Sequence, residues 1–154
     1  NSKSYKLFKA AQLSNLEIKK IFFFAKKINL DIFSRSGDIE TIDFIDKLNP
    51  CAHKISSGLL SHLPLIKYTA KKGKLVIIST GMGTKKEIVK AVKTVTEAGN
   101  KRILLLHCVS MYPTNHKNLN LMGFQTHNAV LKILKIGLSA LKVLVTVIQK
   151  HIIN

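Results

Sequence analysis

The segment from Lys74 to Thr114 constrains the fold of this chain more than any other part of the sequence. It contains two apolar runs, LVIIST and RILLLHCVS, and a helix-like stretch lies between them. Each run ends in small or polar residues that are able to bind an anion or a metal. Parallel α/β proteins alternate buried strands with helices in this way, and their sites lie at the carboxyl ends of the strands. The pattern therefore predicts a strand–helix–strand unit with a candidate site at its polar end.

The rest of the sequence continues this alternation. We expect helices at Leu16–Ile28, Ile39–Leu48, Leu63–Lys72 and Lys85–Ala98. We expect strands at Asn29–Ser34, His53–Ser56, Lys74–Ser79 and Arg102–Val109. Ser14, Asp38 and Thr84 precede three of the helices and belong to residue types that are preferred at N-caps. A repeat of about 20–25 residues is typical of a parallel sheet or barrel. Because no Pro/Gly/Ser-rich linker interrupts it, residues 1–154 are expected to form one domain.

The charge of the chain is extreme for its length. The formal net charge is +17 over 154 residues, and only Arg35 and Arg102 among the cations are arginines. Nucleic-acid interfaces depend on the bidentate and stacking contacts of arginine, so this composition favours a solvated, lysine-rich surface. A charge-driven nucleic-acid binder remains an alternative. A positive potential would also attract an anionic substrate.

Two further features bear on the compartment. Cys51 and Cys108 form neither a CxxC pair nor a disulfide framework, and the N-terminal residues do not resemble a signal peptide. These observations favour the cytoplasm. The segment Ala129–Ile148 is apolar, but Lys132, Lys135 and Lys142 interrupt it and share one face of a helix. We favour a helix followed by a buried strand there, with a membrane-surface helix as the alternative.

The run KISSGLLSHLPLIKYTAKKGKLVIISTGMGTKKEI (Lys54–Ile88), followed by LLLHCVSMYPT and NLNL, resembles the sialic acid synthase family. This family contains N-acetylneuraminate, legionaminic acid and pseudaminic acid synthases. The resemblance covers most of the chain and is strongest from Ala52 to Leu121. It implies an incomplete (β/α)8 TIM barrel with strands three to eight, in which the helix between strands six and seven is missing. Strands seven and eight would lie at Met122–His127 and Val143–His151.

The resemblance also implies an activity. Family members condense phosphoenolpyruvate with an N-acetylated hexosamine of the N-acetylmannosamine type, giving a nine-carbon sialic acid and phosphate. They require manganese or magnesium, and the intact family is expected to be homodimeric. The first two barrel strands and the C-terminal antifreeze-like domain have no counterpart in this sequence. We therefore expect a partial synthase barrel that is weakly active or inactive by itself.

By the same resemblance, four residues are expected to bind phosphoenolpyruvate: Lys54, Ser57, Ser79 and Ser110. Two more, His127 and His151, match the metal-binding histidines of the family. Lysine supplies a compact cation for phosphate or carboxylate, and serine hydroxyls donate to the same oxygens. If the chain forms such a barrel, Lys54, Ser79 and both histidines should gather at one rim.

Several residues depart from the family pattern or lack its support. Arg35 stands where relatives carry a threonine that contacts phosphoenolpyruvate. Gln125 and Thr126 replace a serine and an aspartate beside the metal histidine. His107 and Cys108 are expected to serve packing rather than chemistry. The other histidines are interpreted as surface or loop residues: His53, His62 and His116.

Overall fold

The computed structural model describes residues 12–110, 115–120 and 122–123, and the chain divides into two compact units, Asn1–Ile32 and Phe33–Asn154. The described part of the first unit holds helix α2 (Asn15–Lys27). Ser14 caps this helix in a capping box. Its hydroxyl accepts from the Glu17 backbone N–H, and the Glu17 carboxylate accepts from the Ser14 backbone N–H at 2.7 Å. The predicted helix and its cap are confirmed.

The second unit alternates strands and helices. In chain order its elements are β1 (Ser34–Arg35), α3 (Ile39–Lys47), β2 (Ala52–Ile55), the 3-10 turn η1 (Ser57–Leu59), α4 (Leu63–Ala70), β3 (Leu75–Ser79), α5 (Lys85–Glu97), β4 (Ile103–Leu106) and the 3-10 turn η2 (His116–Asn118). The four strands form one sheet in the order β1-β2-β3-β4, and every neighbouring pair is parallel. This confirms the predicted parallel α/β architecture.

The first strand differs from its prediction. Instead of Asn29–Ser34, only Ser34–Arg35 pair with the sheet. Asn29 adopts a φ of 55°, and the Leu30 backbone N–H returns to the Ala25 carbonyl at 2.8 Å. A left-handed residue followed by such a bond is how many helices end. Asn29 and Leu30 therefore terminate α2, and the strand starts later.

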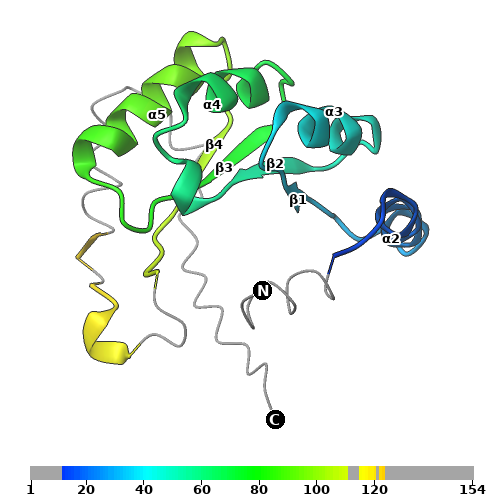
Figure 1. The fold of residues 1–154 in the computed structure, drawn as a ribbon, viewed down its shortest axis with the longest axis horizontal. Coiled ribbons are helices and arrows are strands. Elements are labelled where there is room, and N and C mark those ends of the chain that lie inside the picture. The colour runs from blue at the N-terminus through cyan, green and yellow to red at the C-terminus, as the bar shows by residue number, and fades with distance from the viewer. Residues whose placement is uncertain (1–11, 111–114, 121, 124–154) are drawn as a thin grey trace, which may run out of the picture. The chain divides into compact units, whose positions relative to one another are not determined.

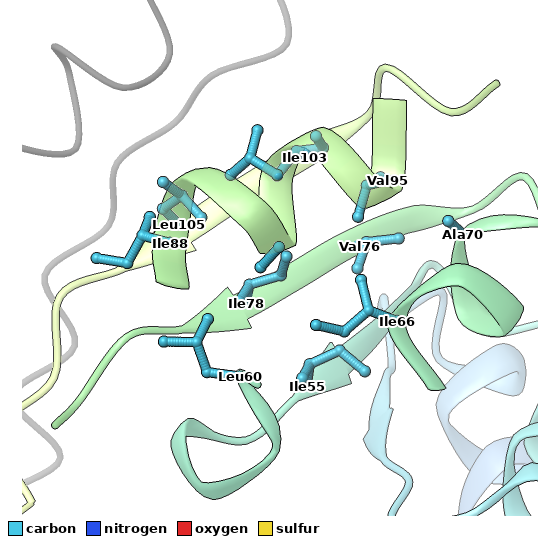
Figure 2. Packing of buried hydrophobic residues seen from close by; sticks show 12 residues of the cluster. Ile55, Leu60, Ile66, Ala70, Val76, Ile78, Ile88, Val95, Ile103 and Leu105 are labelled. Carbon is cyan, nitrogen blue, oxygen red and sulfur yellow. The ribbon is translucent and has the colours of Figure 1, made fainter. Parts of the chain in front are cut away.

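The helices cover one face of the sheet, as Figure 1 shows for α3, α4 and α5. Between the sheet and α4 and α5 lies the main hydrophobic core (Figure 2). Its strand members are Ile55, Val76, Ile78, Ile103 and Leu105. Its other buried members come from α4, α5 and the loop before α4: Leu60, Ile66, Ala70, Ile88, Ala91, Val92 and Val95. Alternation along each strand leaves the remaining residues for the opposite face.

That opposite face carries a smaller apolar cluster. Its buried members are Ala52, Ile77 and Leu106, and Cys108 packs against them together with two partly buried leucines. The prediction that Cys108 serves packing is confirmed. In a TIM barrel the face that lacks helices is the one that lines the barrel interior. The side chains at the carboxyl end of this face are therefore the ones that matter for a site.

The expectation that His53 is a surface or loop residue is wrong. His53 lies in β2 on the helix-covered side, with only 1% of its surface exposed. Its Nε2 lies 3.0 Å from Asp46 Oδ1 of α3. A residue that stands among apolar neighbours on a buried strand is itself buried, and the imidazole then needs a polar partner. His62 is exposed, as expected, and caps α4 by accepting from the Leu65 N–H at 3.1 Å.

Some predictions fall outside the described residues. Of the predicted strand Met122–His127, only Met122 and Gly123 are described, and neither belongs to a strand. The predicted strand Val143–His151 and the amphipathic segment Ala129–Ile148 lie wholly outside. The fourth described strand ends at Leu106 rather than at Val109, because Leu106 is the last residue that pairs with β3. Across the described residues, no helix has both the length and the apolar character that crossing a membrane requires.

Trimming one methyl group from the main core should measurably destabilise the sheet. Ile78 of β3 is fully buried beneath the helices. We expect Ile78→Val to lower the free energy of unfolding by about 0.5–1.5 kcal/mol, since the lost burial leaves a small cavity. The exposed Ile39 gives the matched control, and Ile39→Val should change stability by less than about 0.5 kcal/mol. Urea denaturation would measure both, and equal losses would contradict the assigned core.

Candidate functional site

The carboxyl ends of the parallel strands bring several serines to one edge of the sheet. Ser57 follows β2, Ser79 is the last residue of β3, and Ser110 follows β4 by a few residues. Because all neighbouring strands are parallel, these positions meet at the same edge. This is the edge at which α/β proteins place their ligands. Three of the predicted phosphoenolpyruvate residues therefore share one end of the fold.

Lys54 lies close to that edge on the face that lacks helices. In the sheet register it stands beside Arg35 of β1 and Ile77 of β3. Ile77 belongs to the smaller apolar cluster, which identifies the face. Lys54 is half-buried, and burial lowers the pKa of its ammonium below the ordinary lysine value. The nearby Cys108 thiol acts in the opposite direction, whereas the charge of Arg35 lowers the pKa of Lys54 further.

No carboxylate among the described residues forms an ion pair with Lys54. The ion pairs of the described part lie elsewhere, at His53–Asp46, Lys72–Asp43 and Lys93–Glu97. A partly buried cation without a counter-charge is costly to the fold. Such a cation is suited to binding an anion, because the bound anion supplies the missing charge.

Ser57, Gly81 and Ser110 converge at one point. The Gly81 backbone N–H donates to Ser57 Oγ at 3.1 Å. A Cβ atom added at Gly81 would lie 2.7 Å from Ser110 Oγ and 2.9 Å from Ser57 Oγ. The segments after β2, β3 and β4 therefore meet here, and a side chain at Gly81 would displace both hydroxyls and lie 3.1 Å from the Cys108 carbonyl oxygen.

Ser79 offers a buried hydroxyl on the same face. It lies two residues beyond Ile77, so its side chain shares the side of the sheet that Lys54 occupies. The residue is 2% exposed, and its Oγ has no hydrogen-bond partner among the described residues. An unsatisfied buried hydroxyl costs about 1–3 kcal/mol, so native proteins rarely keep one without a reason. A ligand oxygen at this edge would provide the partner.

Ser36, which sequence reasoning did not single out, also has a buried hydroxyl that lacks a partner among the described residues. It follows β1 at the same edge, is 3% exposed, and has no hydrogen-bond partner for its Oγ among the described residues. Arg35, interpreted from the sequence only as a departure from the family, stands next to Lys54 in the register. The signal for both was the polar SRS run directly after an apolar stretch.

A separate cavity of about 580 Å³ opens beside β4. Ser110, His107 and Met82 help to line it, but Lys54, Ser57 and Ser79 do not. His107 packs beside Gly123 and its Nε2 lies 2.9 Å from the Leu119 carbonyl oxygen, which fits the predicted packing role. A cation and a buried hydroxyl on the same face and at the same edge are better evidence for an anion site than cavity size, because they supply specific ligand chemistry.

The described residues do not test the metal prediction. His127 and His151 lie outside them. Within the ranges that the structure describes, no group of three or more histidine, cysteine, aspartate or glutamate side chains lies close enough together to hold an ion. The described carboxyl edge carries cations and hydroxyls, and this chemistry fits an anion rather than a divalent metal.

Gly81 gives a direct test of this convergence. We expect Gly81→Ala to lower the free energy of unfolding by about 1 kcal/mol, because its Cβ would displace two serine hydroxyls and lie 3.1 Å from the Cys108 carbonyl oxygen. Adding Ser110→Ala should restore part of the loss, since it removes the closer oxygen. Gly37→Ala is the control, because nothing lies within 4 Å of a Cβ there. Guanidinium denaturation would give the unfolding midpoint of each variant. Identical midpoints for Gly81→Ala and Gly37→Ala would refute the crowding at Gly81.

Comparisons with known proteins identify the family of the chain. The model of the NeuB family matches residues 1–148. An uncharacterized protein of Methanocaldococcus jannaschii is 40% identical over 86% of this chain and 39% of its own length. The N,N'-diacetyllegionaminic acid synthase of Campylobacter jejuni is 34% identical over 86% of this chain and 43% of its own length. The chain thus spans about two fifths of these curated relatives.

The structural comparison points to the same proteins. The N-acetylneuraminic acid synthetase of Leptospira borgpetersenii, solved in complex with citrate, superposes with a TM-score of 0.78 and 28% identity. The match covers 84% of this chain and 45% of that enzyme. The parallel sheet with helices on one face is therefore similar to part of a sialic acid synthase barrel. Because the family model covers nearly the whole sequence, this chain belongs to the NeuB family.

Proposed function

We propose that the carboxyl edge of this chain binds phosphoenolpyruvate as part of a sialic acid-type synthase. The main support for this proposal is the environment of Lys54. Its cation is half-buried and has no carboxylate partner among the described residues. The buried hydroxyl of Ser79 and the converging hydroxyls of Ser57 and Ser110 add oxygen partners at the same edge. Cations and hydroxyl groups are the ligands that phosphate and carboxylate groups require.

In the proposed reaction, the second substrate is an N-acetylated hexosamine of the N-acetylmannosamine type. The methylene carbon of phosphoenolpyruvate forms a bond to the aldehyde carbon of the open-chain sugar, and the aldehyde oxygen takes up a proton. Water adds to the cationic carbon that results, and phosphate leaves, giving a nine-carbon keto acid. The described residues contribute to this reaction by binding and orienting the anion. Such positioning removes part of the entropic barrier of a bimolecular reaction.

The charge of Lys54 favours the binding of an anion but lowers the free energy of unfolding. Burial lowers its pKa in the folded state, so the charged ammonium disfavours folding at any pH below that lowered pKa. The cost disappears as the pH rises from the folded-state pKa to the ordinary value of 10.5. Lys54→Met should therefore raise the free energy of unfolding at pH 7, and the gain should shrink in strongly alkaline solution.

The same substitution should weaken the binding of phosphoenolpyruvate. We expect the affinity for phosphoenolpyruvate, measured by isothermal titration calorimetry, to fall at least about tenfold in Lys54→Met, because a charge-assisted contact is lost. Lys101→Met is the matched control, since Lys101 is exposed and precedes β4 at the opposite edge of the sheet. Equal affinities for the Lys54 and Lys101 variants would refute the proposed site, and so would a wild-type chain that binds no phosphoenolpyruvate.

We further propose that His127 and His151 bind manganese or magnesium, on the strength of the family resemblance alone. Imidazole suits divalent transition ions. Manganese should bind the wild-type chain, as measured by loss of the free-ion electron paramagnetic resonance signal. His127→Ala and His151→Ala should each weaken that binding at least about tenfold, a range seen when metal-site partners are lost. His62→Ala, at an exposed helix cap, is the control. Undiminished manganese binding in a variant that carries both His127→Ala and His151→Ala would contradict the assignment.

The assembly and compartment also remain proposals. A homodimer is the proposed state of the intact enzyme, and the cytoplasm its proposed compartment, since neither of the two described cysteines forms a disulfide. No role in this proposal requires nucleic acid or a membrane.

A further inference from the structure

We infer that Arg35 is a second cation of the anion site and sets its preference for a ligand with two anionic groups. The inference rests on the proposed function, because it concerns the same edge of the sheet. It assigns a binding role to a residue that departs from the family pattern.

The register places Arg35 beside Lys54. These two residues are Cα partners in the β1–β2 pairing. Paired residues of neighbouring strands project to the same side of a sheet. Arg35 therefore shares with Lys54 the face that the helices leave uncovered, on which Ser79 also lies.

A hydrogen bond directs the guanidinium toward the carboxyl edge. Arg35 Nε donates to Ser56 Oγ, and Ser56 lies just beyond the end of β2. Ser56 is two residues beyond Lys54, so the bond runs on the Lys54 side of the sheet. With Nε engaged, the two terminal nitrogens of the guanidinium keep donors for a carboxylate or phosphate.

The charges at this point are unbalanced. The positive charge of Arg35 disfavours the charged form of Lys54, and the described ion pairs involve neither residue. Two neighbouring cations repel each other, and Lys54, unlike the exposed Arg35, is also partly desolvated. An anion between them would convert that repulsion into attraction.

The chemistry of the two cations is complementary. Lysine acts as a compact point charge, whereas arginine presents a planar fork that matches a carboxylate or phosphate in a bidentate manner. A ligand with one phosphoryl and one carboxylate group, such as phosphoenolpyruvate, satisfies both cations at once. A ligand with a single anionic group satisfies one of them.

The test compares wild-type protein with Arg35→Gln, Arg35→Lys and Lys54→Gln in calorimetric titrations with phosphoenolpyruvate and with inorganic phosphate. Arg35→Gln should weaken phosphoenolpyruvate binding about tenfold to a hundredfold, the range expected for a hydrogen bond to a charged group. Its effect on inorganic phosphate should be smaller, and Arg35→Lys should recover part of the affinity. Arg102→Gln is the matched control, because Arg102 is the other arginine and precedes β4 at the opposite edge.

The salt dependence separates a ligand contact from a structural role. If Arg35 contacts the anion, Arg35→Gln should flatten the dependence of the dissociation constant on salt concentration. A structural role would lower the melting temperature measured by circular dichroism and leave that dependence unchanged, which would overturn the inference. If Arg35→Gln binds like wild type while Lys54→Gln is weakened, only the role of Arg35 fails. If the wild-type chain binds no phosphoenolpyruvate, the proposed function fails as well.

Discussion

The parallel register of β1, β2 and β3 is the constraint on which the site depends. It sets Arg35, Lys54 and Ile77 in one row and leaves Ile55 and Ile78 for the other face. Shifting β2 by one residue would turn Lys54 into the hydrophobic core and Ile55 toward the uncovered face. The free energy gained by burying Ile55 and Ile78 under the helices therefore also fixes where the cation lies. Packing and binding are decided by the same strand pairing.

The uncovered face is stabilised less than the helix-covered face. Among the described residues its cluster has three buried members, whereas the cluster beneath the helices has twelve. Ser79, which lies near the smaller cluster, has an unsatisfied hydroxyl, and Lys54 carries a lowered pKa. Polar groups that lower the stability of the fold are common at functional sites. Lys54 and Ser79 thus place two unfavourable terms at the edge where a ligand would relieve them.

Local signals in the sequence predicted the helices well. Ser14, Asp38 and Thr84 cap α2, α3 and α5 as expected, because an N-cap depends on residues three positions apart. Of the predicted strand Asn29–Ser34 only Ser34 lies in β1, because the left-handed Asn29 still belongs to the end of α2. The burial of His53 was missed for another reason: its partner, Asp46, is brought to it only by the packing of α3 on the sheet.

The site was predictable in part. Lys54, Ser57 and Ser79 were identified by resemblance to a family, and the structure adds their surroundings. The position of Arg35 beside Lys54 needed the register of a two-residue strand, which no sequence pattern specifies. Short edge strands carry little periodic signal, and their pairing is set by the rest of the sheet. Residues on such strands are where a three-dimensional structure contributes most.

The bond from the Gly81 N–H to Ser57 Oγ joins two loops that are far apart in the sequence. The segment after β2 is thereby held to the segment after β3, close to where α5 begins. A displacement of either segment must break this bond or carry the other segment with it. The two segments therefore move together while this bond holds. Whatever orders the segment after β2 then also positions the amino end of α5.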